Sequence, residues 1–342
     1  MASLHEILSM LRGQAFGKTW IPDLDLSGKT IVITGANTGL GLECAKHLAR
    51  LRASQIILAC RDLTKDEAAK GSIVEETACA NRTDIEVWEL DLASFASVLA
   101  FGKRVRTQLK RLDAFIANAG VEMQEFKVAE GLELQLTVNV VSCFLCAIAV
   151  LPKLRKTAEA HNIDTTLTFC GSMYHIMGPD AELDVPEDQD AFEILNDTER
   201  TDIIWRYALT KLIVHHCYHK LAACLSSSLE QRRPCVVANM INPGWGETEL
   251  SRAKPHPLGE RVGFAILGWS AEKGSRAYIH AISAGRDSHG RYLSECQFKQ
   301  ESGYIRSERG RHNEEKIWQD LMRRIEKISP EVAGFIDRGW YL

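Results

Sequence analysis

Short apolar runs alternate with longer amphipathic stretches along the chain from residue 29 onward. Each run is followed by turn or helix-starting residues, which predicts β-strands at residues 30–33, 55–60, 85–90, 114–117, 166–170 and 235–241. The intervening helices are predicted to begin at Gly39, Leu63, Ser94, Leu132 and Tyr207. This alternation indicates an α/β fold with a Rossmann-like, doubly wound parallel sheet, in which ligands bind at the carboxyl ends of the strands.

Three segments lie outside the periodic region, which we expect to be a single domain over residues 28–290. The N-terminal arm, residues 1–27, has apolar positions at near-helical spacing and is expected to dock on the core; a helix on a membrane surface is the alternative. Residues 178–202 form an acidic insertion with little periodicity, which predicts a loop. Residues 291–342 form a C-terminal extension packed on the same domain. Its amphipathic helix at residues 314–328 should cover the core or part of the substrate opening with a stripe of Ile317, Leu321, Ile325 and Ile328.

The composition is that of an ordinary globular protein, with 342 residues, 45% hydrophobic and 25% charged. The formal net charge of -4 lacks the lysine and arginine excess of a nucleic-acid surface, so no nucleic-acid partner is expected. The ten cysteines are scattered, which favours a reducing compartment, and we expect a cytoplasmic protein. The apolar run at residues 136–151 contains Asn139 and Ser142 and is short for an integral membrane span, so it predicts a buried helix.

The first predicted strand is followed at once by a glycine-rich turn and a helix, which is the context of a dinucleotide-binding loop. Gly35 permits the tight turn, Gly39 lets the backbone approach a pyrophosphate, and Gly41 lets the helix pack closely on the strand. Amides at the start of the helix would face the anion. The residues expected to bind the cofactor here are Gly35, Asn37, Thr38, Gly39, Leu40 and Gly41.

The end of the second strand indicates which dinucleotide is bound. Cys60 stands in the place of an acid that would select NAD, and Arg61 offers a planar charged fork suited to a 2′-phosphate. The sequence therefore predicts NADP(H) as the cofactor. The alternative is that Arg61 pairs with Asp62 or solvent and selects nothing.

Further cofactor contacts are expected at the ends of the third and fourth strands. Asp91, followed by Leu92, would accept a hydrogen bond from the adenine amino group, or else cap the next helix. Small residues after the fourth strand would let the chain pass close to the cofactor, and these are Asn118, Ala119 and Gly120.

Tyr207 and Lys211 are four residues apart and so share one face of the predicted helix. That spacing alone is common, but Ser172 stands at the end of a preceding strand and the glycine-rich loop lies upstream. The chain resembles the short-chain dehydrogenase/reductase family, of classical type, in the order of its motifs: the glycine-rich loop, residues 118–120, Asn139, Ser172, Tyr207, Lys211 and residues 242–244.

The resemblance covers residues 29–250, and the sequences at residues 59–62 and 243–250 look closest to retinol-dehydrogenase-like members. Two features depart from the family pattern. Gly171 replaces a serine that often precedes the catalytic one, and Ser172 and Tyr207 are 35 positions apart, which is longer than usual. The acidic insertion accounts for the excess; it could form a lid, block the helix packing through which relatives dimerise, or remain a solvated loop. The sequence leaves a monomer and a homodimer equally open.

The resemblance implies a set of catalytic roles. A neighbouring ammonium and a nicotinamide cation favour phenolate, so Tyr207 would be the general acid/base, with its pKa lowered by Lys211. Ser172 would hydrogen-bond the substrate oxygen, Lys211 would also hold the nicotinamide ribose, and Asn139 would support a water-linked proton relay. The chain after the sixth strand would pass the nicotinamide, or form a turn only, through Pro243, Gly244, Trp245 and Thr248.

The sequence thus predicts an NADP(H)-dependent oxidoreductase, a ketone or aldehyde reductase for a lipophilic small molecule. The alternative is a protein of the same fold with non-redox activity: an isomerase, a cyclase or a cofactor-gated binding protein. The lipophilic substrate follows from apolar residues expected near the pocket, which are Met173, Tyr174, Ile176, Met177 and Trp245. No metal is expected, because His215 and His219 lack a third ligand and Cys143 and Cys146 fit buried apolar positions.

Overall fold

The computed structural model describes residues 3–230, 233–246, 250 and 267–337. All six predicted strands are present, each within one residue of its expected bounds: β1 (Thr30–Thr34), β2 (Gln55–Cys60), β3 (Asp84–Glu89), β4 (Ala114–Ala117), β7 (Thr165–Cys170) and β8 (Val236–Asn242). The helices between them are α2 (Gly39–Arg50), α3 (Leu63–Thr77), α4 (Phe95–Gln108), α5 (Cys143–His161), α7 (Ile203–Glu230) and α9 (Ala271–Ser283).

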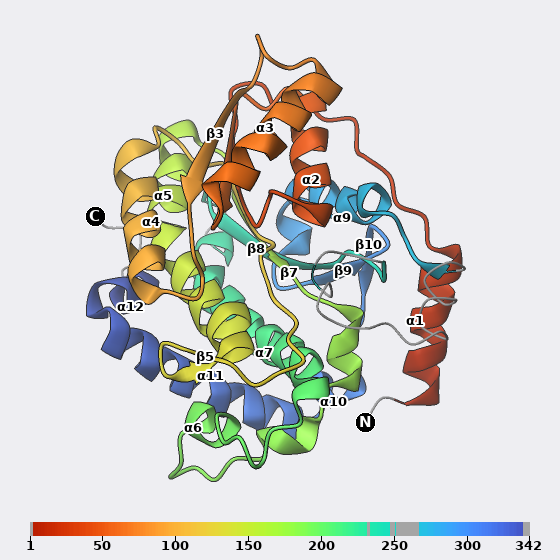
Figure 1. Cartoon of the computed structure of the whole chain (residues 1–342), viewed down its shortest axis with the longest axis vertical. Coiled ribbons are helices and arrows are strands. Elements are labelled where there is room, and N and C mark those ends of the chain that lie inside the picture. The colour runs from red at the N-terminus through yellow and green to blue at the C-terminus, as the bar shows by residue number, and fades with distance from the viewer. Residues whose placement is uncertain (1–2, 231–232, 247–249, 251–266, 338–342) are drawn as a thin grey trace.

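Together with β9 (Tyr292–Ser294) and β10 (Gln297–Lys299), these strands form one sheet in the order β10-β9-β8-β7-β4-β1-β2-β3 (Figure 1). β1 pairs in parallel with both β2 and β4, so the winding direction of the chain reverses beside β1. This reversal is the topological switch point at which doubly wound sheets bind ligands. The α/β Rossmann-like fold expected from the sequence is confirmed.

Side chains of β1 alternate between two apolar cores. Ile31 and Ile33 are buried with residues of α2 and α9, whereas Val32 is buried with residues of α4, α5 and α7. Because each face of the sheet is covered by helices, the strands are apolar almost throughout, as their sequence pattern indicates.

The sheet extends beyond the expected core. β9 (Tyr292–Ser294) pairs in parallel with β8, and β10 (Gln297–Lys299) pairs antiparallel with β9. The expectation that residues 291–342 lie outside the periodic region is therefore wrong for these two strands, which belong to the central sheet. Strands of three residues are too short to show a period. A hairpin of β5 (Val128–Ala129) and β6 (Leu132–Glu133) was also missed; Glu130 and Gly131 turn it with positive φ.

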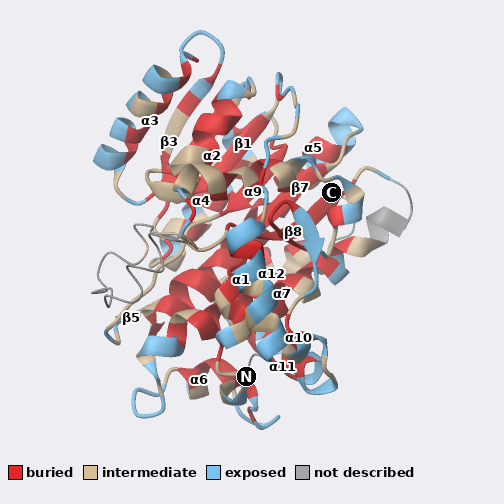
Figure 2. Cartoon of the chain, turned by 90° about the vertical axis from the view of Figure 1, so that its right-hand side faces the viewer, coloured by how far each residue is buried: buried red, intermediate tan, exposed pale blue. Residues whose placement is uncertain are grey.

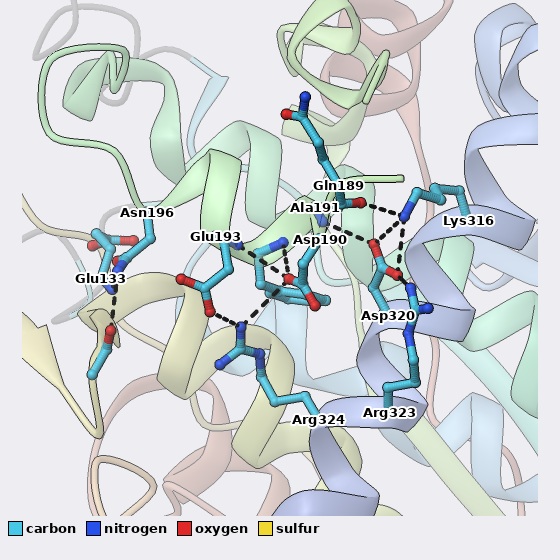
Figure 3. A network of polar contacts seen from close by, with 12 residues as sticks. Glu133, Gln189, Asp190, Ala191, Glu193, Asn196, Lys316, Asp320, Arg323 and Arg324 are labelled. Carbon is cyan, nitrogen blue, oxygen red and sulfur yellow. Dashed lines mark hydrogen bonds and ion pairs between the residues drawn. The ribbon is translucent and has the colours of Figure 1, made fainter. Parts of the chain in front are cut away.

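The acidic insertion is a packed structure and not a solvated loop. It contains a short 3₁₀ helix, Asp180–Leu183, and α6 (Ala191–Leu195), and its Leu183 and Phe192 belong to the apolar core. Its backbone is tied to α11 (Glu308–Ile328), because the Ala191 amide donates to Asp320 at 2.8 Å (Figure 3). The apolar residues that dock it stand too far apart to give a helical or strand period.

The C-terminal extension covers the helices on one side of the sheet. After the short α10 (Gly303–Arg306), α11 packs on α7 and α12 (Pro330–Asp337) packs on α5 (Figure 1). Ile317, Leu321 and Ile325 are fully buried in the core, so this stripe covers the core as expected.

Residues 136–161 form the one described helix that is long and apolar enough to cross a membrane. Its apolar window is 94% buried inside the protein, which is the environment of a core helix. It begins with a π-helical stretch, Leu136–Ser142, that continues into α5.

The N-terminal arm forms α1 (Leu4–Phe16), capped by Ser3. Leu4, Leu8 and Leu11 are 72%, 56% and 40% exposed, so the apolar positions do not dock the helix. Gly13 and Gln14 are its buried residues, and the outward side of α1 is coloured as exposed in Figure 2. The helix α1 is held by polar contacts, whereas the rest of the arm docks as expected, with Leu26 buried in the core and Leu24 packed against it.

Candidate active site

A cleft of about 470 Å³ lies at the carboxyl ends of the central strands. It is lined by almost every residue singled out from the sequence: Gly35, Asn37, Thr38, Gly39, Leu40, Gly41, Arg61, Asp91, Leu92, Asn118, Ala119, Gly120, Ser172, Tyr207, Lys211, Pro243, Gly244 and Trp245. Asn139 lies one layer behind it. Thr248 falls outside the described residues.

The glycine-rich loop has the backbone geometry that its sequence predicts. Gly35 and Gly39 have φ values of +65° and +55°, in the left-handed region that favours glycine. A Cβ on Gly41 would lie 2.4 Å from the Gly35 carbonyl oxygen, so only glycine fits. Thr38, the N-cap of α2, makes no side-chain capping bond, which leaves the first amides of α2 to an anion in the cleft.

The loop is fixed to β4 by Asn118. Its Nδ2 donates to the carbonyl oxygens of Thr34 at 2.8 Å and Gly35 at 3.1 Å, and its Oδ1 accepts from the Tyr278 hydroxyl at 2.6 Å. Asn118 therefore shapes the cofactor loop, a role that sequence reasoning had left to its small size. Tyr278 was missed, because no local pattern connects α9 with β4.

At the end of β2, Asp62 accepts from the Lys65 amide at 3.3 Å and lies 3.5 Å from the Lys65 ammonium. Asp62 is thus engaged by Lys65, while Arg61 is exposed at the edge of the cleft. Burial raises the pKa of Cys60 to about 12, and its Sγ accepts from the Ala36 amide at 3.1 Å. Two carboxylates lie nearby: Asp62 lines the same cleft, and the buried Asp66, whose own pKa burial raises, lies beside the Cys60 thiol.

Asp91 does not cap α4. Ser94 is that N-cap, and Asp91 instead accepts from the Ala93 amide at 2.9 Å, which corrects the alternative reading of this residue. Asp91 still lines the cleft beside Leu92, where an adenine would lie.

Ser172 follows β7 by two residues and caps the 3₁₀ helix Met173–Met177 by accepting from the Tyr174 amide at 3.2 Å. Ser172 is 8% exposed, and its hydroxyl lowers the pKa of the Tyr207 phenol. In a 3₁₀ helix residues three apart share a face, so Met173 and Ile176 point together into a second cavity, away from the cleft. Of the five residues expected near the pocket, only Tyr174 and Trp245 line the cleft.

Burial raises the pKa of Tyr207 well above its ordinary value, the nearby Cys170 and Glu122 raise it further, and the Ser172 hydroxyl lowers it. Lys211 Nζ lies 5.6 Å from the centre of the Tyr207 ring and donates to the Cys170 carbonyl oxygen at 2.8 Å. Lys211 alone therefore does not bring the pKa of Tyr207 below that of a free tyrosine.

Asn139 lies in the π-helical stretch, a distortion that often marks functional positions. Its Oδ1 accepts from the Val121 amide at 2.8 Å, and its Nδ2 donates to the Val121 carbonyl at 2.9 Å and the Thr210 hydroxyl at 3.2 Å. Asn139 thus connects the chain after β4 to the helix that carries Tyr207.

The segment after β8 is tied through Asn242 to the chain that directly follows Ser172. Asn242 Oδ1 accepts from the amides of Met173 and Gly244, both at 3.2 Å. Gly244 has a φ of +83°, and a Cβ there would lie 2.4 Å from the Trp269 ring. The residues expected at the nicotinamide are therefore held in register with Ser172.

The histidines farther along α7, the helix that carries Tyr207, form ion pairs with glutamates. His219 lies 2.6 Å from Glu301 and 2.9 Å from Glu314, and these two carboxylates raise its pKa to about 9. Burial raises the pKa of Cys143 to about 12 and also raises that of Cys146, as fits buried apolar positions.

The cleft and its fold match those of known proteins. Residues 29–172 match the family model of the short chain dehydrogenases. A short chain dehydrogenase/reductase of Cryptosporiopsis sp. is 37% identical over 96% of this chain and 99% of its own, and a short-chain dehydrogenase of Penicillium roqueforti is 33% identical over 95% and 85%. The chain therefore belongs to the short-chain dehydrogenase/reductase family.

Solved structures agree on the fold at low sequence identity. A putative short chain dehydrogenase from Shigella flexneri in complex with NADP has a TM-score of 0.58 and 21% identity, covering 81% of this chain and all of its own. An uncharacterised protein from Mycobacterium paratuberculosis has a TM-score of 0.63 and 21% identity, covering 95% of this chain and all of its own.

Proposed function

We propose that this protein is an NADP(H)-dependent oxidoreductase that reduces a ketone or aldehyde of a lipophilic small molecule. The observation that carries the proposal is the meeting of Ser172, Tyr207 and Lys211, far apart in sequence, on one side of the cleft that the glycine-rich loop closes on the other. A binding module would have no chemical need for a tyrosine, a serine and a lysine gathered at one place in the cleft.

The residues present fit a dinucleotide. The uncapped start of α2 and the open side of Gly39, where a Cβ would meet nothing within 4 Å, leave room and amide donors for a pyrophosphate. Arg61 would bind the 2′-phosphate, Asp91 the adenine, and Lys211 the nicotinamide ribose. Several solved structures of similar fold are complexes with NADP or NADPH, which supports the same preference.

When bound, NADPH supplies the hydride. Tyr207 Oη donates a proton to the substrate oxygen, for which its raised pKa suits it, since the phenol stays protonated at neutral pH. Ser172 Oγ hydrogen-bonds the same oxygen and stabilises the charge that develops on it. Lys211, held by the Cys170 carbonyl, places an ammonium near the phenol as its proton leaves. Asn139 would support reprotonation through water.

The lipophilic substrate rests on the lining of the cleft. Tyr174 packs edge-on against Tyr207 with ring centres 6.1 Å apart, and Leu134, Val138 and Trp245 add apolar surface. The likeness of residues 59–62 and 243–250 to retinol-dehydrogenase-like members supports the same substrate class.

All ten cysteines are free, which supports a reducing, cytoplasmic location.

The test is turnover of NADPH with a panel of hydrophobic ketones and aldehydes. We expect at least one substrate, a loss of about 10²–10⁴-fold in kcat for Tyr207→Phe, and unchanged NADPH binding by that variant. Turnover that survives Tyr207→Phe would contradict the assigned acid. NADPH binding without turnover of any carbonyl would favour the non-redox alternatives.

A further inference from the structure

We propose that Gln14 of the N-terminal helix is a positioning residue for the nicotinamide end of the cofactor site. The proposal rests on the proposed NADP(H) function. Gln14 is 3% exposed, and its side chain makes three hydrogen bonds to backbone more than 200 residues away. Burial of a polar glutamine side chain brings no hydrophobic stabilisation, so its hydrogen bonds account for its buried position.

Gln14 binds both backbone groups of Trp245. Its Oε1 accepts from the Trp245 amide at 2.8 Å, and its Nε2 donates to the Trp245 carbonyl at 2.8 Å and to the Leu267 carbonyl at 2.6 Å. Donor and acceptor together fix the peptide planes on both sides of Trp245, as a neighbouring strand would. Trp245 and its neighbours Gly244 and Gly246 line the cleft opposite Ser172 and Tyr207.

Gln14 also positions the indole ring of Trp269, which packs against Gly244. The Gln14 carbonyl oxygen accepts from the Trp269 indole at 2.8 Å, and the Trp269 amide donates to the Trp245 carbonyl at 2.8 Å. Since a Cβ on Gly244 would lie 2.4 Å from the Trp269 ring, the position of that ring limits where Gly244 can lie. Gln14 therefore fixes the nicotinamide-side backbone from outside the cleft.

The remaining contacts of α1 place the helix without reaching the cleft. Glu6 accepts from the Gly303 amide at 2.6 Å, and Gly13 packs so closely on Glu295 that a Cβ would lie 2.8 Å from its Oε1. None of the residues that would bind the adenosine half, from Gly35 to Asp91, is among the hydrogen-bond partners of Gln14 in the described part of the chain. Loss of the Gln14 side chain should therefore weaken binding of the nicotinamide end of the cofactor and leave binding of the adenosine end unchanged.

The test compares NADPH with adenosine 2′,5′-bisphosphate, which carries the adenosine half alone, in calorimetric titrations of the full-length protein. For Gln14→Ala we expect NADPH to bind about tenfold more weakly, as fits the loss of one or two net hydrogen bonds, and the bisphosphate to bind within about twofold of the wild type. Gln14→Glu should behave alike, because a carboxylate cannot donate to the Trp245 and Leu267 carbonyls. Leu8→Ala, on the exposed side of α1, is the matched control and should change neither ligand.

Three results would overturn the inference. Equal weakening of both ligands by the Gln14 variants indicates a general structural role, and no weakening of either indicates that Trp245 is positioned without Gln14. A wild-type protein that binds neither ligand overturns the NADP(H) proposal itself, and is thereby distinguished from the first two results.

Discussion

The Lys211 ammonium donates to the carbonyl oxygen of Cys170 at 2.8 Å, across the gap between α7 and the end of β7. This bond uses one of three N–H donors, and it fixes the lysine beside Ser172, which follows two residues after Cys170. The ammonium is therefore placed by the fold of the chain itself.

Lys211→Met should retain the fold but lose most of the activity. The methionine fills a similar volume without the charge that assists proton transfer from Tyr207, so we expect kcat to fall by at least about 10²-fold and the KM for NADPH to rise. Steady-state kinetics measure both. The control is Lys220→Met. Lys220 lies on the same helix as Lys211, and this substitution removes only its ion pair with Glu315. Equal activity of the two variants would contradict the role of Lys211.

The pH dependence should follow the raised pKa of Tyr207. The phenol must be protonated to act as an acid, so kcat/KM for reduction should stay level through neutral pH and fall only as pH rises through a pKa above about 10. Because the Glu122 carboxylate raises this pKa, Glu122→Gln should move the falling limb to lower pH. Glu125→Gln, an exposed carboxylate paired with Lys127, should leave the profile unchanged. A falling limb unmoved by Glu122→Gln would contradict the electrostatic link.

Arg61→Ala should remove the preference for NADPH. A charge-assisted contact with the 2′-phosphate is worth about 1.5–3 kcal/mol, so the Kd for NADPH should rise roughly 10–100-fold, while that for NADH should stay the same. Fluorescence titration measures both. Lys70→Ala, farther along α3, controls for net charge. A wild-type protein without preference between the two cofactors would reject the assignment.

The buried ion pair beneath the acidic insertion should be needed for stability. Lys316 is 3% exposed and Asp320 0%, their charged atoms lie 2.9 Å apart, and Lys316 also donates to the Gln189 carbonyl at 2.6 Å (Figure 3). Asp320→Ala leaves the buried ammonium without its partner, so urea denaturation should show a loss of about 3–5 kcal/mol. Glu315→Ala, at an exposed pair on the same helix, should cost less than about 1 kcal/mol. Equal losses of unfolding free energy in the two variants would contradict a stabilising role for the ion pair beneath the acidic insertion.

His219 should make part of the stability depend on pH. Its pKa is raised to about 9 by Glu301 and Glu314, so the stabilisation is fully present below about pH 6.5, its pKa when unfolded, and is lost as pH rises through 9. Unfolding free energies at pH 6.5 and 9 should differ more for the wild type than for His219→Gln. The buried cysteines contribute equally to the pH dependence of the unfolding free energy in both proteins. The difference in pH dependence between the two proteins therefore reports on His219.

Local sequence patterns were sufficient to predict the central strands and much of the cleft. The apolar runs located β1 to β4, β7 and β8, and glycine, tyrosine and lysine spacing located the loop and Tyr207 with Lys211, because these features are set within a few residues of each other. Features that depend on distant pairs were missed. Gln14 bonds to residues 231 and 253 positions away, and nothing in the sequence around it marks that contact.

Two errors have a common physical origin. Met173 and Ile176 were expected at the pocket, but the 3₁₀ turn after Ser172 directs them to the opposite side, and a short turn leaves no period by which to assign a face. The pKa of Tyr207 was expected to fall because the charges of Lys211 and of a nicotinamide cation were counted and the burial of the phenol was not. Burial is a property of the assembled fold, and it exceeds the effect of the lysine here.

Deuterium transfer tests the central claim most directly. The protein is incubated with NADPH deuterated at the transferable position of the nicotinamide and with a carbonyl substrate, and the alcohol is analysed by mass spectrometry. Our account predicts an alcohol with one deuterium on the former carbonyl carbon from the wild type, and about 10²–10⁴-fold less of it from Tyr207→Phe. An alcohol without deuterium, or equal yields from both proteins, would contradict hydride transfer assisted by Tyr207.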